Sequence, residues 1–204
     1  MRLSCLYVVS VMVAGFVPLA AQVPVVRANS FEIGGFFGAS YGIDQFRAMG
    51  GGNVTYAINK YILPYVEYSY FPGIGRVENG TFAGTGNPYT LRYAIPLSDF
   101  HGGVHIRFPI HEKPIVPYAV FGVGALTHFD HTVNATYTVA GQMTQTSQLD
   151  VPGGSDFAVN FGGGLRYYVT QRFGFRVEAK AYKPTGAFTQ VFGKVEGGIF
   201  IQLR

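Results

Sequence analysis

Apolar and polar side chains alternate along much of this chain, most clearly from Asp156 to Tyr182. One parity of this stretch is apolar, with Phe157, Val159, Phe161, Leu165 and Tyr167 before a break at residues 170–172, and Phe173, Phe175 and Val177 after it. The other parity carries Arg166, Arg176, Glu178 and Lys180. Because successive side chains of a strand point to opposite faces, the pattern predicts a β-hairpin with one apolar and one charged face.

The same alternation predicts six further strands. They cover about residues 30–40, 49–58, 61–71, 98–109, 115–127 and 191–203. Asn59 and Lys60 connect the second and third of them, and we expect a tight turn there in which Asn59 takes a positive φ. Residues 72–97 and 128–153 lack sustained alternation and are predicted to be long loops, the second of which could carry strand extensions at its base.

The connections between the eight predicted strands alternate in length. Those at residues 59–60, 110–114 and 170–172 are short, and the others are longer. Outer-membrane barrels combine short periplasmic turns with long external loops in this way. A tilted strand of about 10 residues is long enough to cross a bilayer. A sheet that closes into a barrel leaves no unpaired strand edge in the hydrocarbon. The pattern predicts an all-β fold, an eight-stranded antiparallel up-and-down transmembrane β-barrel.

Composition agrees with a barrel that faces lipid. The 204 residues are 16% aromatic and only 13% charged, against roughly 25% charged in soluble domains. No internal apolar run approaches the ~20 residues of a membrane helix. The net charge is +4, but the basic residues are scattered, so the sequence indicates no nucleic-acid partner.

Nine charged residues share the parity opposite to the aromatic one and predict a lumen ion-pair network. They are Glu32, Glu67, Arg107, Arg166, Arg176, Glu178, Lys180, Lys194 and Glu196. A base that faced lipid would cost about 2–4 kcal/mol near the midplane, whereas charges inside a narrow barrel can pair. An eight-stranded lumen is also too narrow for the many rings of the apolar parity. The alternative is a soluble barrel that wears the same charges on its surface.

The N-terminal segment has the pattern of an export signal. Arg2 precedes an apolar region at residues 3–16, and Leu19-Ala20-Ala21 suits cleavage, so residues 1–21 are predicted to be a signal peptide. Residues 22–29 would then be a leader and 30–204 the barrel domain. An uncleaved membrane anchor is the alternative. Cys5 is the only cysteine, so the exported chain would have neither a disulfide nor a thiolate site.

Two motifs resemble a known family. The segment FGGGLRYYVTQRFGFRVEAKAY at residues 161–182 resembles the glycine-rich penultimate hairpin of small outer-membrane barrels of the OmpA/OmpX type. The segment from Glu196 to Leu203 resembles the family's assembly signal, although here Arg204 follows where the family usually ends on an aromatic. The resemblance implies the bacterial outer membrane as the location. It implies as partners outer-membrane lipids, lipopolysaccharide and the barrel-assembly machinery, the last through the C-terminal strand.

Candidate catalytic and metal residues are few. His101 and His105 lie four apart on one strand, about 13 Å by strand rise, too far to bind one metal ion. His128, Asp130 and His131 could form a surface metal site, but loop polarity explains them as well. The glycines at 162–164 lie mid-strand without the helix and lysine of a phosphate loop. We therefore predict no catalytic, cofactor or metal site.

These observations favour a non-enzymatic role. We expect a contribution to envelope integrity, or surface contact with an extracellular ligand through residues 72–97 and 128–153. A large pore is not expected, because side chains fill an eight-stranded barrel. The alternatives are a lipid-modifying outer-membrane enzyme, a small pore and a soluble ligand-binding barrel.

Overall fold

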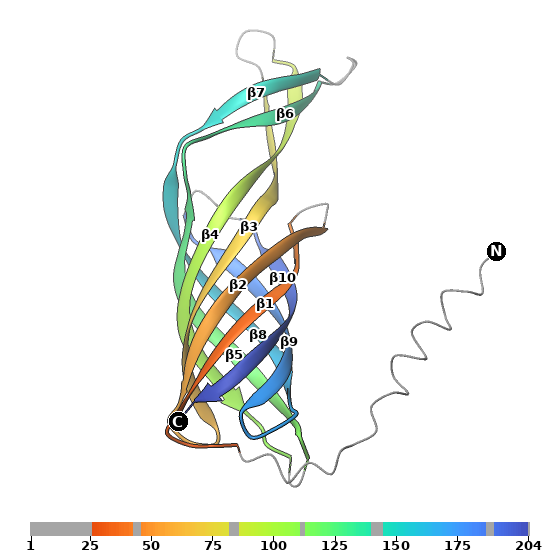
Figure 1. Ribbon diagram of the computed structural model, residues 1–204. Helices are drawn as coiled ribbons and strands as arrows, with labels where there is room; N and C mark the ends of the chain where they lie inside the picture. Colours follow the sequence, from red (N-terminus) through yellow and green to blue (C-terminus); the bar gives the residue numbers. More distant parts are fainter. Residues whose placement is uncertain are drawn as a thin grey trace, which may run out of the picture.

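The computed structural model describes residues 26–42, 46–81, 86–110, 113–139, 145–186 and 190–203, and their regular structure is β-strand (Figure 1). The strands are β1 (Ser30–Tyr41), β2 (Phe46–Ala57), β3 (Ile62–Thr81), β4 (Pro88–Arg107), β5 (Ile115–His128), β6 (His131–Val139), β7 (Gln145–Val151), β8 (Gly154–Tyr168), β9 (Phe173–Pro184) and β10 (Phe192–Leu203). No helix within these residues is long and apolar enough to cross a membrane. The predicted signal peptide, residues 1–21, lies outside the described residues.

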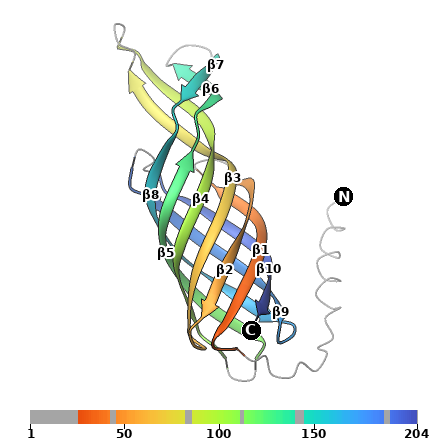
Figure 2. The same cartoon turned by 60° about the vertical axis from the view of Figure 1, so that its left-hand side comes forward.

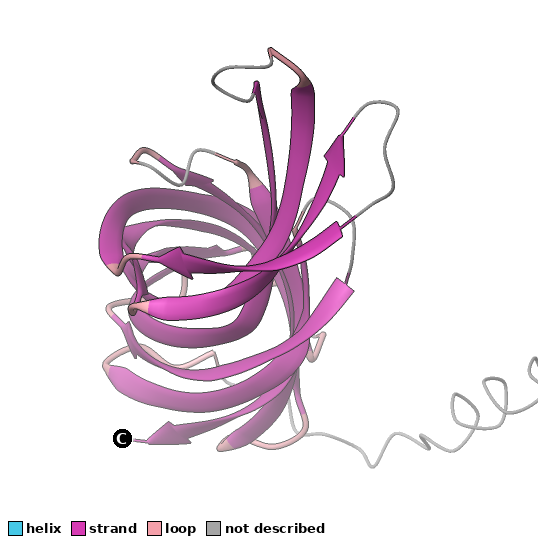
Figure 3. Cartoon of the chain, turned by 90° about the horizontal axis from the view of Figure 1, so that it is seen from above, coloured by secondary structure: helices cyan, strands magenta, loops and turns pink. Residues whose placement is uncertain are grey.

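Eight of the strands close into an antiparallel barrel. They follow one another around the wall in the order β3, β2, β1, β10, β9, β8, β5 and β4, and a β3–β4 pairing completes the ring. The first and last strands, β1 and β10, pair directly, from Phe31 opposite Leu203 to Tyr41 opposite Gly193. Viewed from above, the strands curve around a common axis (Figure 3). The predicted fold class is confirmed.

The apolar parity lies on the outside of this barrel. Phe157, Phe161 and Phe175 are 53%, 56% and 42% exposed, although large aromatic side chains are normally buried in a soluble domain. Arg166 and Glu178, on the opposite parity of the same hairpin, are buried. The barrel is therefore inside out: its apolar side chains form the wall that meets lipid, and its charges fill the interior.

The tight turn after β2 is closed by a side chain. The Asn59 Oδ1 atom accepts hydrogen bonds from the backbone N–H groups of Tyr61 at 2.7 Å and Ile62 at 2.8 Å. The expected positive φ at Asn59 is wrong, because Asn29 is the non-glycine residue with a positive φ (52°) among those described. Asparagine suits this turn because its carbonyl replaces a backbone acceptor.

The two predicted loops are mostly strand, so that prediction is wrong. β3 continues to Thr81 and β4 begins at Pro88, and their pairing resumes at Ile74 after a bulge that follows Phe71. Residues 128–153 contain β6 and β7, which pair with each other, and β6 also pairs with β4 at residues 89–92. Residues 74–81, 88–97, β6 and β7 thus form a four-stranded extension above the barrel (Figure 2). We call this extension the projecting sheet.

Inward glycines make room for the side chain of Phe36 in the lumen. A Cβ atom on Gly51 would lie 2.6 Å from Cζ of Phe36, and one on Gly198 would lie 2.9 Å from the Phe36 Cβ atom. Gly197 faces outward, and a Cβ atom there would have no neighbour within 4 Å. The ring of Phe36 therefore lies over the backbone of Gly51 and its Cβ atom lies close to Gly198, two approaches that a side chain at either glycine would prevent.

Candidate functional site: the lumen network and the projecting sheet

The structure places all nine predicted lumen residues inside the barrel. Each is at most 4% exposed: Glu32, Glu67, Arg107, Arg166, Arg176, Glu178, Lys180, Lys194 and Glu196. Asp99, which was not among the predicted lumen residues, is also fully buried in the lumen. Its parity, shared with His101, was the signal that could have found it. With Asp99 included, five carboxylates face five basic groups among the described lumen residues, so their formal charges balance when histidine is counted as neutral.

The lower cluster lies near the short turns. Arg107 of β4 and Arg166 of β8 both donate to the carboxylate of Glu32 on β1, Arg107 at 3.3 Å. Thr55 of β2 also donates to Glu32 at 3.3 Å, and Arg107 donates to the Tyr168 hydroxyl at 3.0 Å. Four strands are thereby joined across the barrel through one buried carboxylate. Charge-assisted bonds of this kind are the strong ones in a dry interior.

The central cluster lies above it and contains six charged groups. Lys180 contacts Glu67 at 2.8 Å and Glu178 at 2.6 Å, and Lys194 contacts Glu67 at 2.6 Å and Glu196 at 2.8 Å. Arg176 completes the cluster with a 3.0 Å contact to Glu196. Oxygens of the three carboxylates lie within 4.8 Å of one another, a spacing that could suit a metal ion. The two ammonium groups supply the positive charge that this spacing requires.

His105 joins the two clusters. Arg166 donates to His105 Nδ1 at 2.8 Å, which makes Nδ1 an acceptor and leaves the proton on Nε2. The Nε2 atom lies 3.8 Å from the Glu178 carboxylate, and the ring stacks on Tyr65 with centroids 4.4 Å apart. The imidazole therefore continues the contacts from Glu32 through Arg166 to Glu178.

His101 lies above the central cluster and is fully occupied. Its Nδ1 atom bonds to the Asp99 carboxylate, and its Nε2 atom lies 3.1 Å from the backbone carbonyl of Ala158. A histidine that served as a general base to a serine would need one of these nitrogens free to reach the hydroxyl. His101 and Asp99 resemble two members of a catalytic triad, but their geometry supplies no nucleophile.

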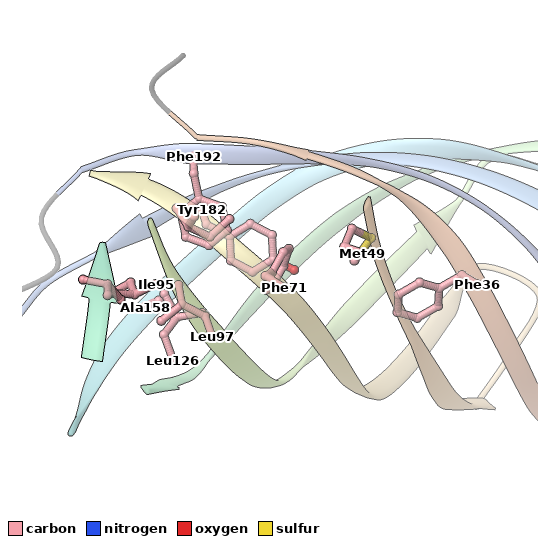
Figure 4. Close-up of a cluster of buried hydrophobic side chains, with 11 residues drawn as sticks. Phe36, Met49, Phe71, Ile95, Leu97, Leu126, Ala158, Tyr182 and Phe192 are labelled. Carbon is pink, nitrogen blue, oxygen red and sulfur yellow. The ribbon is translucent and has the colours of Figure 1, made fainter. Parts of the chain in front are cut away.

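An apolar cluster closes the upper end of the lumen. It includes Phe71, Leu97, Leu126, Tyr182 and Phe192, each at most 3% exposed (Figure 4). Tyr182 and Phe192 stack with ring centroids 4.8 Å apart and a 5° angle between their planes. The lumen therefore has two layers, a charged one within the barrel and an apolar one at the external mouth.

His128, Asp130 and His131 are not brought together as a metal site. Asp130 accepts a 2.5 Å hydrogen bond from the Gly153 N–H and so holds the junction between the barrel and the β6–β7 hairpin. Among the described residues, the group whose ligand atoms lie close enough for one ion is Glu67, Glu178 and Glu196.

The arrangement has counterparts among solved structures. The N-terminal β-barrel domain of Pseudomonas aeruginosa OprF superposes with a TM-score of 0.51 and 14% identity, over 86% of this chain and 98% of that domain. The chain has the fold of the small outer-membrane β-barrels. Also similar are the attachment invasion locus protein Ail of Yersinia pestis (TM-score 0.48, 11% identity, 87% of this chain and 100% of Ail) and Neisserial surface protein A (0.48, 12%, 84% and 95%).

No protein-family model and no curated protein matches the sequence. The location of this outer-membrane barrel follows from its own surfaces. An apolar wall around a charged core, without a sheet edge in the wall, is the form in which a sheet crosses the outer membrane. The protein is therefore an integral protein of the bacterial outer membrane.

The projecting sheet of this outer-membrane barrel packs onto the apolar cluster that closes the lumen, because Ile95 and Val133 belong to that cluster. Leu91, Ile95 and Val133 are buried on the side that faces the mouth of the barrel. On the same side, the Tyr93 hydroxyl donates to the Glu78 carboxylate. Burial, followed by this hydrogen bond, raises the pKa of Tyr93 to about 12. Tyr93 therefore remains a donor at neutral pH, and the contact fastens β4 to β3 outside the membrane.

Proposed function

We propose that this protein is a non-enzymatic outer-membrane barrel with a closed lumen, which contributes to envelope integrity and presents the projecting sheet to the exterior. The observation that carries the proposal is the filled interior. Four acids and five bases contact one another there, Asp99 contacts His101, and an apolar cluster lies above them. A path for solutes would require these buried charges to separate, which is costly once their partners are lost.

Planar-bilayer recording of the purified protein tests the closed lumen. We expect no stable, large conductance at neutral pH and moderate salt. Glu67→Gln provides an internal comparison, because it weakens the contacts of Lys180 and Lys194 in the central cluster. A stable large conductance of the unaltered protein would overturn the proposal and favour a pore.

Surface contact is supported by the exposed edges of the projecting sheet. Within the described residues, β7 pairs only with β6, and residues 74–81 of β3 pair only with β4. Exposed edges of this kind can accept an extended segment of another chain. The test replaces residues 78–91 by an Asn-Gly turn and compares the attachment of cells that express either form. Equal attachment by equally abundant proteins would remove surface contact from the proposed function.

A lipid-modifying enzyme is the alternative that histidine substitutions separate from this proposal. His101 and His105 are fully buried in the lumen, away from the lipid-facing wall. We expect single alanine substitutions of His101, His105, His128 and His131 to leave lipid A unchanged by mass spectrometry. A lipid A modification that requires the protein, and that one substitution abolishes, would establish the enzyme instead.

Export and assembly complete the proposal. We infer that residues 1–21 are removed and that β10 presents the assembly signal to the barrel-assembly machinery. N-terminal sequencing of the membrane-inserted protein should begin near Gln22, and a start at Met1 would indicate an anchor. Leu203→Asp should lower the amount of assembled barrel more than Val191→Asp, which changes a residue outside the signal segment. Outer-membrane lipids and lipopolysaccharide are the proposed surroundings of the wall.

A further inference from the structure

The lipid-facing side of the barrel continues upward as one face of the projecting sheet. β4 is paired without a bulge on its own side from Arg107 to Pro88, because the register shift falls in β3. Even-numbered residues of β4 therefore stay on one side throughout. Phe100 on this side is 60% exposed toward lipid. Thr90 and Arg92, higher on the same strand, lie on the same side outside the membrane.

Two pairs of hydroxyl groups form a band on the outward side of the sheet, at the upper edge of the lipid-facing wall. The Tyr68 and Ser98 hydroxyls lie 3.2 Å apart, and those of Thr127 and Ser155 lie 2.5 Å apart. Polar tips on an apolar wall are typical of the membrane–water interface. Below the band the outward side chains of the wall are apolar. Above it Phe129 is still exposed, and the outward side of β4 carries Pro96 and Ala94 before Arg92 and Thr90. The outward side chains of β6 and β7 are polar.

Above the band lies what we call the outer polar face, formed by Thr90, Thr132, Asn134, Thr136, Thr146 and Gln148. The cross-strand register places these residues side by side: Thr136 is opposite Arg92 on β4 and Thr146 on β7, and Asn134 is opposite Gln148. Directly opposed residues of neighbouring strands share a face of the sheet. The face is thus a continuous array of hydroxyl and amide groups.

The charge of this face is balanced. One basic and one acidic residue lie beside it on the same side of the sheet, among the described residues. Arg92 is opposite Thr136, and Asp150 is opposite Thr132, from which it accepts a 2.7 Å hydrogen bond. Hydroxyl and amide groups both donate and accept hydrogen bonds. Such a face matches a partner whose own surface is made of hydroxyl groups, more closely than it matches a charged segment or an apolar chain.

The position of the outer polar face indicates which hydroxyl-rich molecule lies next to it. From Ser98 to Pro88, β4 extends about 33 Å along the strand. The outer polar face rises over this length directly from the lipid-facing wall, so the molecules beside it are those anchored in the same leaflet. In the outer membrane these molecules include glycolipids, whose sugars stand above the acyl chains.

We propose that the outer polar face binds the carbohydrate of outer-leaflet glycolipids and that the wall below it contacts their acyl chains. This inference rests on the proposed function in one respect, that the projecting sheet stands outside the membrane. It names a partner for the outer side of the sheet, whereas the proposed surface contact uses its edges.

The test titrates two glycolipids into the folded, detergent-solubilised protein and measures binding by native mass spectrometry. One glycolipid is lipopolysaccharide with its core oligosaccharide, and the other is lipid A without it. We expect the core-bearing form to bind at least about tenfold more tightly, because only this form reaches the outer polar face. Asn134→Ala, Thr136→Ala and Thr146→Ala combined should reduce its affinity to that of lipid A.

The matched control changes an exposed residue of the mouth-facing side, His131→Ala, and should keep the tenfold preference. Heat-modifiable gel mobility confirms that each variant is folded. Equal affinity of the unaltered protein for both glycolipids would overturn the proposal, as would a triple variant that keeps the preference. A stable conductance in planar bilayers would contradict the closed-lumen proposal without changing the glycolipid affinities. Failure of the closed-lumen proposal and failure of the glycolipid proposal are therefore distinguishable.

Discussion

The barrel wall and the projecting sheet share strands, yet their faces are reversed. In the lower half of β4 the inward residues are Asp99, His101, His105 and Arg107, and the outward ones include Phe100 and Val104. In the upper half the inward residues are Leu91, Tyr93, Ile95 and Leu97, and the outward ones include Thr90 and Arg92. The strand keeps its parity while its surroundings change from lipid to water. The contrast teaches that the medium outside the sheet, rather than the strand, decides which face is apolar.

The largest expected loss of stability comes from removing a charged group from the barrel interior. Glu178→Ala removes the acceptor of the Tyr118 hydroxyl at 2.6 Å and one of the two carboxylates that Lys180 contacts, so the central cluster keeps an uncompensated positive charge. A buried charge without its partner costs about 3–5 kcal/mol, so the free energy of unfolding should fall by that order. Urea titration in phospholipid vesicles, followed by circular dichroism, measures it. Glu78→Ala in the projecting sheet is the control and should shift the midpoint little. An unchanged midpoint for Glu178→Ala would place this residue in solvent.

The second prediction compares one substitution on the two outward surfaces. Val123→Lys puts a base on the lipid-facing wall, where Val123 is 53% exposed, and should cost about 2–4 kcal/mol. Thr136→Lys puts the same base on the outer polar face and should change stability by about 0.5 kcal/mol or less. The same urea titration measures both. Similar costs for the two variants would show that both surfaces meet the same medium.

The third prediction separates the projecting sheet from the barrel. Leu91→Ala shortens a buried side chain on the mouth-facing side of the projecting sheet and should cost about 2 kcal/mol locally. Limited proteolysis should then cut the projecting sheet sooner, while the heat-modifiable gel mobility of the barrel stays unchanged. Loss of that mobility would mean that the two regions unfold as one unit. Ser98→Ala, below the projecting sheet, is a suitable control.

The smallest expected effect compares two threonine-to-carboxylate hydrogen bonds. Thr55 donates to Glu32 at 3.3 Å in the buried lower cluster, and Thr132 donates to Asp150 at 2.7 Å in water. Thr55→Ala should cost about 1–2 kcal/mol, because the buried carboxylate loses a partner that water cannot replace. Thr132→Ala should cost about 0.5 kcal/mol or less. Equal costs in urea titration would imply that water reaches Glu32.

The same contrast explains what could be predicted from the sequence. Strands in the wall alternate strongly because lipid demands apolar side chains on one face, and so all eight wall strands were identified. Outside the membrane that demand ends, and residues 72–97 carry glycine, proline and threonine instead. The alternation there was too weak to predict the projecting sheet, whose strands are held by pairing with neighbours.

For the lumen, parity indicated which residues share the interior but not which of them meet. Pairs such as Lys180 with Glu67 and Arg166 with Glu32 join residues 113 and 134 positions apart. Such contacts depend on the stagger between strands around the whole ring, and no local pattern encodes this stagger. Asp99 lies within the predicted strand at residues 98–109 and on the parity of His101, so the alternation contained the signal for this residue.

The unbroken course of β4 has a mechanical consequence. Its residues face β3 in 18 register pairs, from within the membrane to the tip of the projecting sheet. Because β3 and β4 follow one another in the chain, a pull on that tip along the strands tensions both of them together. It loads in shear the backbone hydrogen bonds that β3 makes with β2 and that β4 makes with β5 in the barrel. The barrel holds the lower ends of β3 and β4 in the bilayer, and these two strands transmit the force from the tip to the barrel. An object held at the tip would therefore be held against considerable force.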